Sequence, residues 1–144
     1  MKPEQIKIIV LTFNQVVSNK DRVGQMFYER LFSIAPETRP MFKGDMAEQR
    51  QKLMDTLALA VGALRDMPNL VATLEGLALR HVAYGVRDEH YDKVGEALIW
   101  TLEKGLGDAF TRDVREAWTA LYGKISQIMR KAATNGPSHD AAVA

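Results

Sequence analysis

The sequence of 144 residues contains no cysteine. This absence excludes disulfides, thiolate metal ligands and cysteine nucleophiles from the chain, and it is typical of a reducing compartment. Long apolar runs are also missing, because the longest, residues 57–64, is far shorter than the roughly 20 residues that span a bilayer. Charge of one sign is lacking too, since 19 basic and 18 acidic residues leave a formal net charge of +1. We therefore expect neither a nucleic acid nor a membrane as partner.

The N-terminal segment does not have the pattern of a signal peptide. Its apolar run is interrupted by Lys7, Thr12 and Asn14, and no cleavage site of small residues follows. We therefore expect the protein to be cytoplasmic.

Strand signals are missing as well, because no segment alternates apolar and polar residues between turn pairs. Apolar residues instead recur at helical spacing. They predict seven helical segments, over about residues 3–17, 21–32, 36–42, 46–64, 69–84, 88–105 and 111–134, with caps at Asp21, Asp45, Asp88 and Thr111. We expect an all-α domain over residues 1–134 and a flexible tail over residues 135–144, where Gly, Pro, Ser and Ala are mixed.

Three polar residues fall on otherwise apolar helix faces, namely Tyr28, Gln49 and His81. A buried glutamine is costly unless its amide finds a partner. Taken one at a time, each residue also fits an ordinary core: a glutamine solvated at the edge, a tyrosine with its hydroxyl at the rim, or a histidine satisfied inside. Single residues therefore do not separate a functional site from a helical bundle.

Five motifs, taken together and in their order along the chain, distinguish a functional site from an ordinary helical bundle. They are residues 27–32 (FYERLF), Pro36 with Phe42, Gln49 with Leu53, residues 79–86 (LRHVAYGV) and residues 118–123 (WTALYG). Together they resemble the globin family, most closely the single-domain bacterial haemoglobins and the haem domain of flavohaemoglobins. The resemblance extends from about residue 5 to about residue 130, and Gln49 lies thirty-two residues before His81, the separation that the family requires.

The resemblance implies a globin fold around one haem b (iron protoporphyrin IX), with His81 as the iron ligand. Tyr28, Gln49 and Leu53 would stabilise a diatomic gas, either dioxygen, nitric oxide or carbon monoxide, on the distal side. Lys52 and Arg80 are candidates for the haem propionates, although both also fit solvated surface charges. The full set of expected cofactor-binding residues is Phe42, Lys52, Leu53, Leu57, Leu77, Arg80, His81, Val86, Tyr91, Val94 and Leu98.

Two other histidines are weaker candidates for the iron. His139 falls in the expected tail, and His90 falls in the first turn after Asp88, where we expect it to face solvent. On the proximal side, Tyr91 matches a tyrosine of flavohaemoglobins, but Asn135 stands where their partner glutamate would fall. We therefore expect no strongly electron-donating, peroxidase-like proximal side. The reductase of flavohaemoglobins is not expected in this chain, which has no phosphate-binding glycine loop.

Three functions remain open from the sequence. The first is reversible dioxygen binding, for storage, delivery or scavenging. The second is an enzyme, a nitric oxide dioxygenase that works with a separate reductase. The third is a haem-free globin-like scaffold or a gas-sensor module.

Overall fold

The computed structural model describes the backbone of residues 1–143 and the side chains of residues 1–134. Every regular element among them is a helix: α1 (Pro3–Val17), α2 (Lys20–Ile34), α3 (Met46–Gly62), α4 (Met67–Ala83), α5 (Asp88–Leu106), α6 (Arg112–Val143) and two short 3-10 helices, η1 (Pro36–Met41) and η2 (Gly107–Ala109). The predicted all-α class is confirmed. The side chains of the expected tail, residues 135–144, lie outside the described ones, so that expectation stays a prediction.

Two of the expected helix caps are confirmed. The Asp45 carboxylate accepts a hydrogen bond from the backbone N–H of Ala47 at 3.0 Å, and the Thr111 hydroxyl accepts one from Val114 at 3.3 Å. These side chains satisfy donors that the first turns of α3 and α6 leave without a partner.

The other two expected caps are wrong, because Asp21 and Asp88 lie inside the first turns of α2 and α5. There the negative charge still favours the positive end of the helix dipole. Helix α4 also begins earlier than expected: Asp66 caps it, and Pro68 lies within its first turn, where proline is well tolerated.

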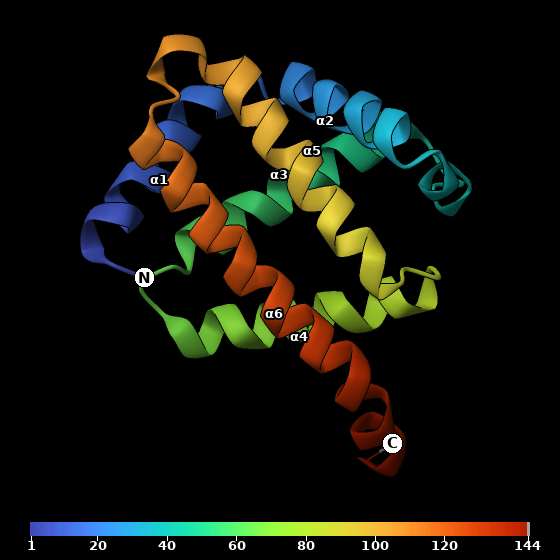
Figure 1. The fold of residues 1–144 in the computed structure, drawn as a ribbon. Helices are drawn as coiled ribbons and strands as arrows, with labels where there is room; N and C mark the ends of the chain where they lie inside the picture. The colour runs from blue at the N-terminus through green and yellow to red at the C-terminus, as the bar shows by residue number, and fades with distance from the viewer. Residues whose placement is uncertain (144) are drawn as a thin grey trace.

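The helices pack in crossing pairs, with α6 against α4 and α1, and α2 against α5 and α3 (Figure 1). Trp118 of α6 is completely buried, and its indole N–H donates to the Thr12 hydroxyl of α1 at 2.9 Å. That hydroxyl donates in turn to the Ile8 carbonyl at 2.7 Å. The polar groups at this crossing are therefore satisfied within the core. Among the described residues, no helix combines the length and apolar content needed to cross a bilayer.

Helices α5 and α6 approach closely at Gly95, where a Cβ atom would lie 2.7 Å from the ring of Tyr122. The Tyr122 hydroxyl donates to the backbone carbonyl of Tyr91 at 2.6 Å. Burial raises the pKa of Tyr122, so this hydroxyl remains a donor at ordinary pH. The contact fixes the first half of α5, which directly follows the segment that carries His81.

The expectation that His90 faces solvent is wrong, since only 2% of the residue is exposed. Its Nδ1 accepts a hydrogen bond from the backbone N–H of Arg87 at 2.9 Å. The ring thereby takes the place that glutamate or glutamine occupies in a capping box, and it folds back over the first turn of α5.

Candidate functional site

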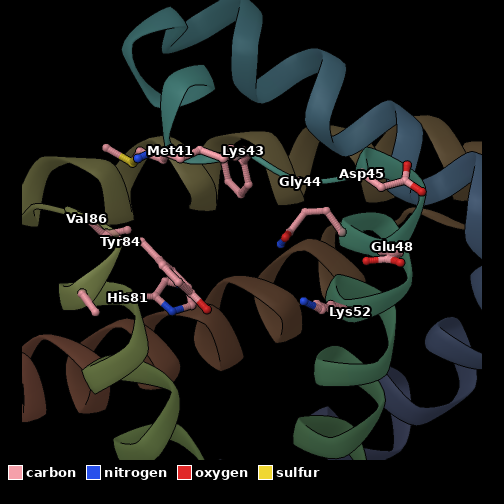
Figure 2. Close-up of a pocket in the computed structure, with 12 residues that line it drawn as sticks. Met41, Lys43, Gly44, Asp45, Glu48, Lys52, His81, Tyr84 and Val86 are labelled. Atoms are coloured by element: carbon pink, nitrogen blue, oxygen red, sulfur yellow. The ribbon is translucent and has the colours of Figure 1, made fainter.

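A pocket of about 380 Å³ lies between α3, the end of α4 and the loop that joins η1 to α3. In Figure 2, Glu48 and Lys52 of α3 stand on one side, and His81, Tyr84 and Val86 stand on the other. The complete lining is Met41, Phe42, Lys43, Gly44, Asp45, Glu48, Gln49, Lys52, His81, Ala83, Tyr84 and Val86. Four residues predicted for the site, Gln49, Phe42, Lys52 and Val86, thus meet His81 around one cavity.

His81 is held in one tautomer by its own helix. Its Nδ1 lies 2.9 Å from the backbone carbonyl of Leu77, one turn earlier in α4. A carbonyl oxygen only accepts, so Nδ1 carries the proton and Nε2 keeps its lone pair. Burial lowers the pKa of His81, which keeps the ring neutral. A neutral imidazole with one fixed N–H and one free lone pair is the form in which histidine binds a metal.

Across the pocket, Gln49 of α3 donates from Nε2 to the hydroxyl oxygen of Tyr28 at 3.0 Å. Tyr28 belongs to α2 and is 6% exposed. It does not line the cavity itself but lies behind Gln49 and Phe42, which do. Burial raises the pKa of Tyr28 to about 12, and the bond from Gln49 lowers it by a smaller amount. The phenol is therefore a neutral hydroxyl whose oxygen already accepts one bond and whose proton has no acceptor among the described residues.

Phe42 belongs to an aromatic cluster on this side of the pocket. Its ring centre lies 5.3 Å from that of Tyr28 and 5.6 Å from that of Phe32, in edge-to-face geometry, and Phe27 meets Tyr28 in the same way at 5.0 Å. Edge-to-face pairs stabilise beyond the area they bury. Through Phe42 the cluster gives the pocket an apolar wall, and it packs the Tyr28 ring between Phe27 and Phe42.

The other predicted site residues lie outside the pocket lining. Leu53, Leu57, Leu77 and Val94 are half-buried and pack on the core, while Tyr91 and Leu98 are buried within it. Arg80 is exposed, and its guanidinium extends back along α4 toward Gly76. Of the two cations predicted for the propionates, the structure therefore brings Lys52 to the pocket but not Arg80.

The sequence interpretation missed Tyr84, which is 58% exposed and lines the pocket with its ring centre 6.1 Å from that of His81. It follows His81 by three residues, a spacing that places two helical side chains on neighbouring parts of one face. That spacing could have identified it. Lys43, directly after Phe42, was missed as well.

Tyr91 of α5 contacts a cation, the guanidinium of Arg130, among the side chains that the structure describes. The Arg130 guanidinium lies 5.4 Å from the centre of the Tyr91 ring and bonds to Asp92 at 2.7 Å. Burial raises the pKa of Tyr91, and the charge of Arg130 lowers it by a smaller amount. The side chain of Asn135 lies outside the described ones. His81 has the Leu77 carbonyl as its Nδ1 partner, and the expectation about the electron-donating strength of the proximal side stays a prediction.

The site thus opposes one neutral histidine to a hydrogen-bonded tyrosine and glutamine within an all-helical fold. The comparisons give the family. The model of the globin family matches residues 25–129, and the chain belongs to this family. It is 33% identical over 128 residues to a flavohemoprotein of Vibrio cholerae serotype O1, and 33% identical over 108 residues to a flavohemoprotein of Rhizobium meliloti.

These matches cover 87% and 73% of this chain but 32% and 27% of the two relatives, so the chain spans about a third of their length. Among solved structures, a bacterial globin from Campylobacter jejuni matches with a TM-score of 0.83 at 27% identity, over 95% of this chain and 99% of that one. A hexacoordinated heme protein from a tardigrade matches with a TM-score of 0.86, over 94% and 96% of the two chains. At 14% identity this last match shows the fold alone.

Membership of the globin family implies a haem cofactor and haem-based binding of diatomic gases. The residues of the pocket fit such a group. His81 offers a free Nε2, Phe42 offers an aromatic face, and Lys43 and Lys52 offer cations for carboxylates at the rim. None of the described residues forms a group of three or more His, Asp or Glu side chains that could hold a bare metal ion.

Proposed function

We propose that this globin binds dioxygen reversibly, for storage, delivery or scavenging, with His81 as the iron ligand of haem b. When bound, the haem supplies an iron atom with one open position at which a diatomic gas can bind and leave. The chain has no cysteine for covalent haem attachment, which favours a haem held by His81 and by packing. His90 competes poorly as a ligand, because its Nδ1 lone pair accepts the Arg87 N–H, so its Nε2 carries the proton and offers no lone pair to a metal.

The observation that carries the proposal is the 3.0 Å bond from Gln49 to the Tyr28 hydroxyl. Because Gln49 occupies a lone pair of the phenol oxygen, the proton of Tyr28 is left for a third group. Dioxygen gains partial negative charge when it is held in the pocket and accepts such a proton strongly, whereas carbon monoxide gains less charge. The raised pKa of Tyr28 keeps this donor protonated at ordinary pH and disfavours the phenolate that would bind iron directly.

The remaining residues supply the walls. We propose that Lys52 holds a propionate at the rim, that Phe42 and Val86 line the cofactor, and that Leu53 and Leu57 close the distal side. Leu77, Val94 and Leu98 support the proximal side from the core, and Tyr91 supports it through α5. Arg80 would reach a propionate only after leaving its position along α4.

Repeated gas exchange tests this function. The ferrous protein is expected to give one oxygenated spectrum under air and to return fully to the deoxygenated spectrum under argon, over several cycles. Protein that oxidises within the first cycle would contradict a carrier. Freshly purified protein without a Soret band would instead support the haem-free scaffold.

Nitric oxide dioxygenation is the second candidate, and the same Tyr28–Gln49 pair favours it. The reaction joins nitric oxide, dioxygen and one electron into nitrate, so an external reductase must supply that electron in every cycle. Stopped-flow mixing of the oxygenated protein with nitric oxide, followed by steady-state turnover with an added reductase, separates the two functions. A single stoichiometric reaction without turnover supports the carrier, whereas sustained nitrate production supports the enzyme.

A further inference from the structure

The hydrogen bond between Tyr28 and Gln49 lies at one end of a longer contact between α2 and α3. On α2, Asp21, Gly24 and Tyr28 are spaced by three and four residues, so they share one face of the helix. On α3, two consecutive residues, Gln49 and Arg50, meet this face. Three of the contacts at this crossing are Asp21 with Arg50, Gly24 with Arg50, and Tyr28 with Gln49.

Arg50 makes two of these contacts. Its Nε donates to Oδ1 of Asp21 at 3.0 Å. Its stem lies over Gly24, where an added Cβ would be 3.0 Å from Arg50 Cβ and 3.3 Å from Arg50 Cγ. Such a distance is shorter than normal side-chain packing, so the two helices approach closely here because α2 has a glycine.

These contacts fix how α3 is oriented on α2. Successive residues of a helix are about 100° apart around its axis, so a rotation of α3 that carried Arg50 away from Asp21 would also move Gln49 relative to Tyr28. We infer that Arg50 is a positioning residue for the distal pair: bonded to Asp21 and packed on Gly24, it holds the Gln49 amide against the Tyr28 hydroxyl. This inference rests on the proposed function, in which that hydroxyl donates to dioxygen.

Exposure distinguishes this role from a contribution to stability. The side chain of Asp21 is 74% exposed and that of Arg50 is 24% exposed. Ion pairs at such exposed positions contribute little to the free energy of folding. The effect of Arg50 is therefore expected in the selectivity between gases rather than in the unfolding midpoint.

The variant Arg50→Met tests this role, because methionine keeps the Cβ and Cγ that pack on Gly24 and removes the guanidinium. We expect the dioxygen dissociation rate to rise about three- to fivefold, the largest change that an ion pair of this exposure can cause, and the carbon monoxide rate to stay within about twofold. Asp21→Asn should reproduce the change. Arg22→Met is the matched control. Arg22 is exposed, it lies next to Asp21 in the first turn of α2, and none of the described residues forms an ion pair with it.

Nuclear magnetic resonance on the carbon monoxide complex of the intact holoprotein gives a second measurement. Cross-peaks between the Gln49 side-chain amide and the Tyr28 ring should weaken in Arg50→Met and persist in Arg22→Met. Unchanged cross-peaks in Arg50→Met overturn the positioning role whatever the kinetics show. A parallel rise of the dioxygen and carbon monoxide rates overturns it too, since that pattern means a generally loosened pocket.

The variant Tyr28→Phe separates this inference from the proposed function. If Tyr28→Phe leaves dioxygen dissociation unchanged, the proposed function fails, and the cross-peaks still decide the role of Arg50. If Tyr28→Phe accelerates dissociation and Arg50→Met does not, the positioning role alone is wrong. In the double variant, Arg50→Met should add less to Tyr28→Phe than it adds to the native protein, because the hydroxyl that the Gln49 amide meets is gone.

Discussion

Replacing Tyr28 with phenylalanine removes one buried hydroxyl and leaves the ring that packs between Phe27 and Phe42. The aromatic cluster should therefore survive, and the change should act on the gas rather than on the fold. A hydrogen bond to a group with partial charge is worth about 1.5–3 kcal/mol. Its loss should raise the dioxygen dissociation rate roughly ten- to a hundredfold, because about 1.4 kcal/mol corresponds to a factor of ten.

The structure argues for the lower half of this range. In the native protein the Gln49 amide donates to the Tyr28 oxygen, and in Tyr28→Phe that amide loses its acceptor. It can then turn toward the gas and replace part of the missing bond. A further substitution of Gln49 in the Tyr28→Phe protein should consequently raise the rate again.

Stopped-flow displacement measures the effect, with dioxygen and carbon monoxide released in separate experiments. The carbon monoxide rate should change much less, since that ligand accepts a weaker bond. Tyr84→Phe is the matched control, because it removes a phenol hydroxyl from a residue that lines the pocket and is 58% exposed. A dioxygen rate in Tyr28→Phe within about twofold of the native rate would refute the assignment, since it corresponds to less than half a kcal/mol.

Three further outcomes are expected. His81→Ala should purify largely without haem, and a normal proximal-histidine spectrum in that variant would mean that another residue binds the iron. Phe42→Ala should accelerate haem loss more than it destabilises the haem-free protein; equal destabilisation of both forms by about 3–5 kcal/mol would make it an ordinary core phenylalanine. Burial raises the Tyr28 pKa from 10.0 to about 12, so the folded state favours the protonated phenol. The resulting stabilisation is present below pH 10 and is lost as the pH rises through 12. Between pH 8 and pH 11, the free energy of unfolding of the haem-free protein in urea should therefore fall by about 1.4 kcal/mol more than that of Tyr28→Phe. If the difference in free energy of unfolding between the two proteins stays the same from pH 8 to pH 11, the Tyr28 hydroxyl is exposed to water and its pKa is not raised.

Much of the fold could be predicted because the signals for helices are local. Apolar spacing located the helices, and Asp45 and Thr111 marked two starts through bonds that reach only two or three residues ahead. His90 shows where this reasoning stops. A histidine in the first turn normally suggests an exposed position. Here the ring folds back and accepts the Arg87 N–H, a contact that the apolar spacing did not predict.

The two sides of the pocket also differ in whether their hydrogen bonds join residues that are close in the sequence. The bond that orients His81 spans four residues within α4, so any helix with this sequence would form it. The bond between Tyr28 and Gln49 spans 21 residues, and that between Asp21 and Arg50 spans 29. Both depend on how closely two separate helices cross, which Gly24 permits but helical periodicity does not encode. Resemblance to the globins supplied Tyr28 and Gln49 as a pair, while Arg50, which lies outside the matched motifs, became visible only in three dimensions. Selectivity for dioxygen over carbon monoxide is therefore expected to respond to substitutions along the α2–α3 crossing, and haem retention to substitutions within the last two turns of α4.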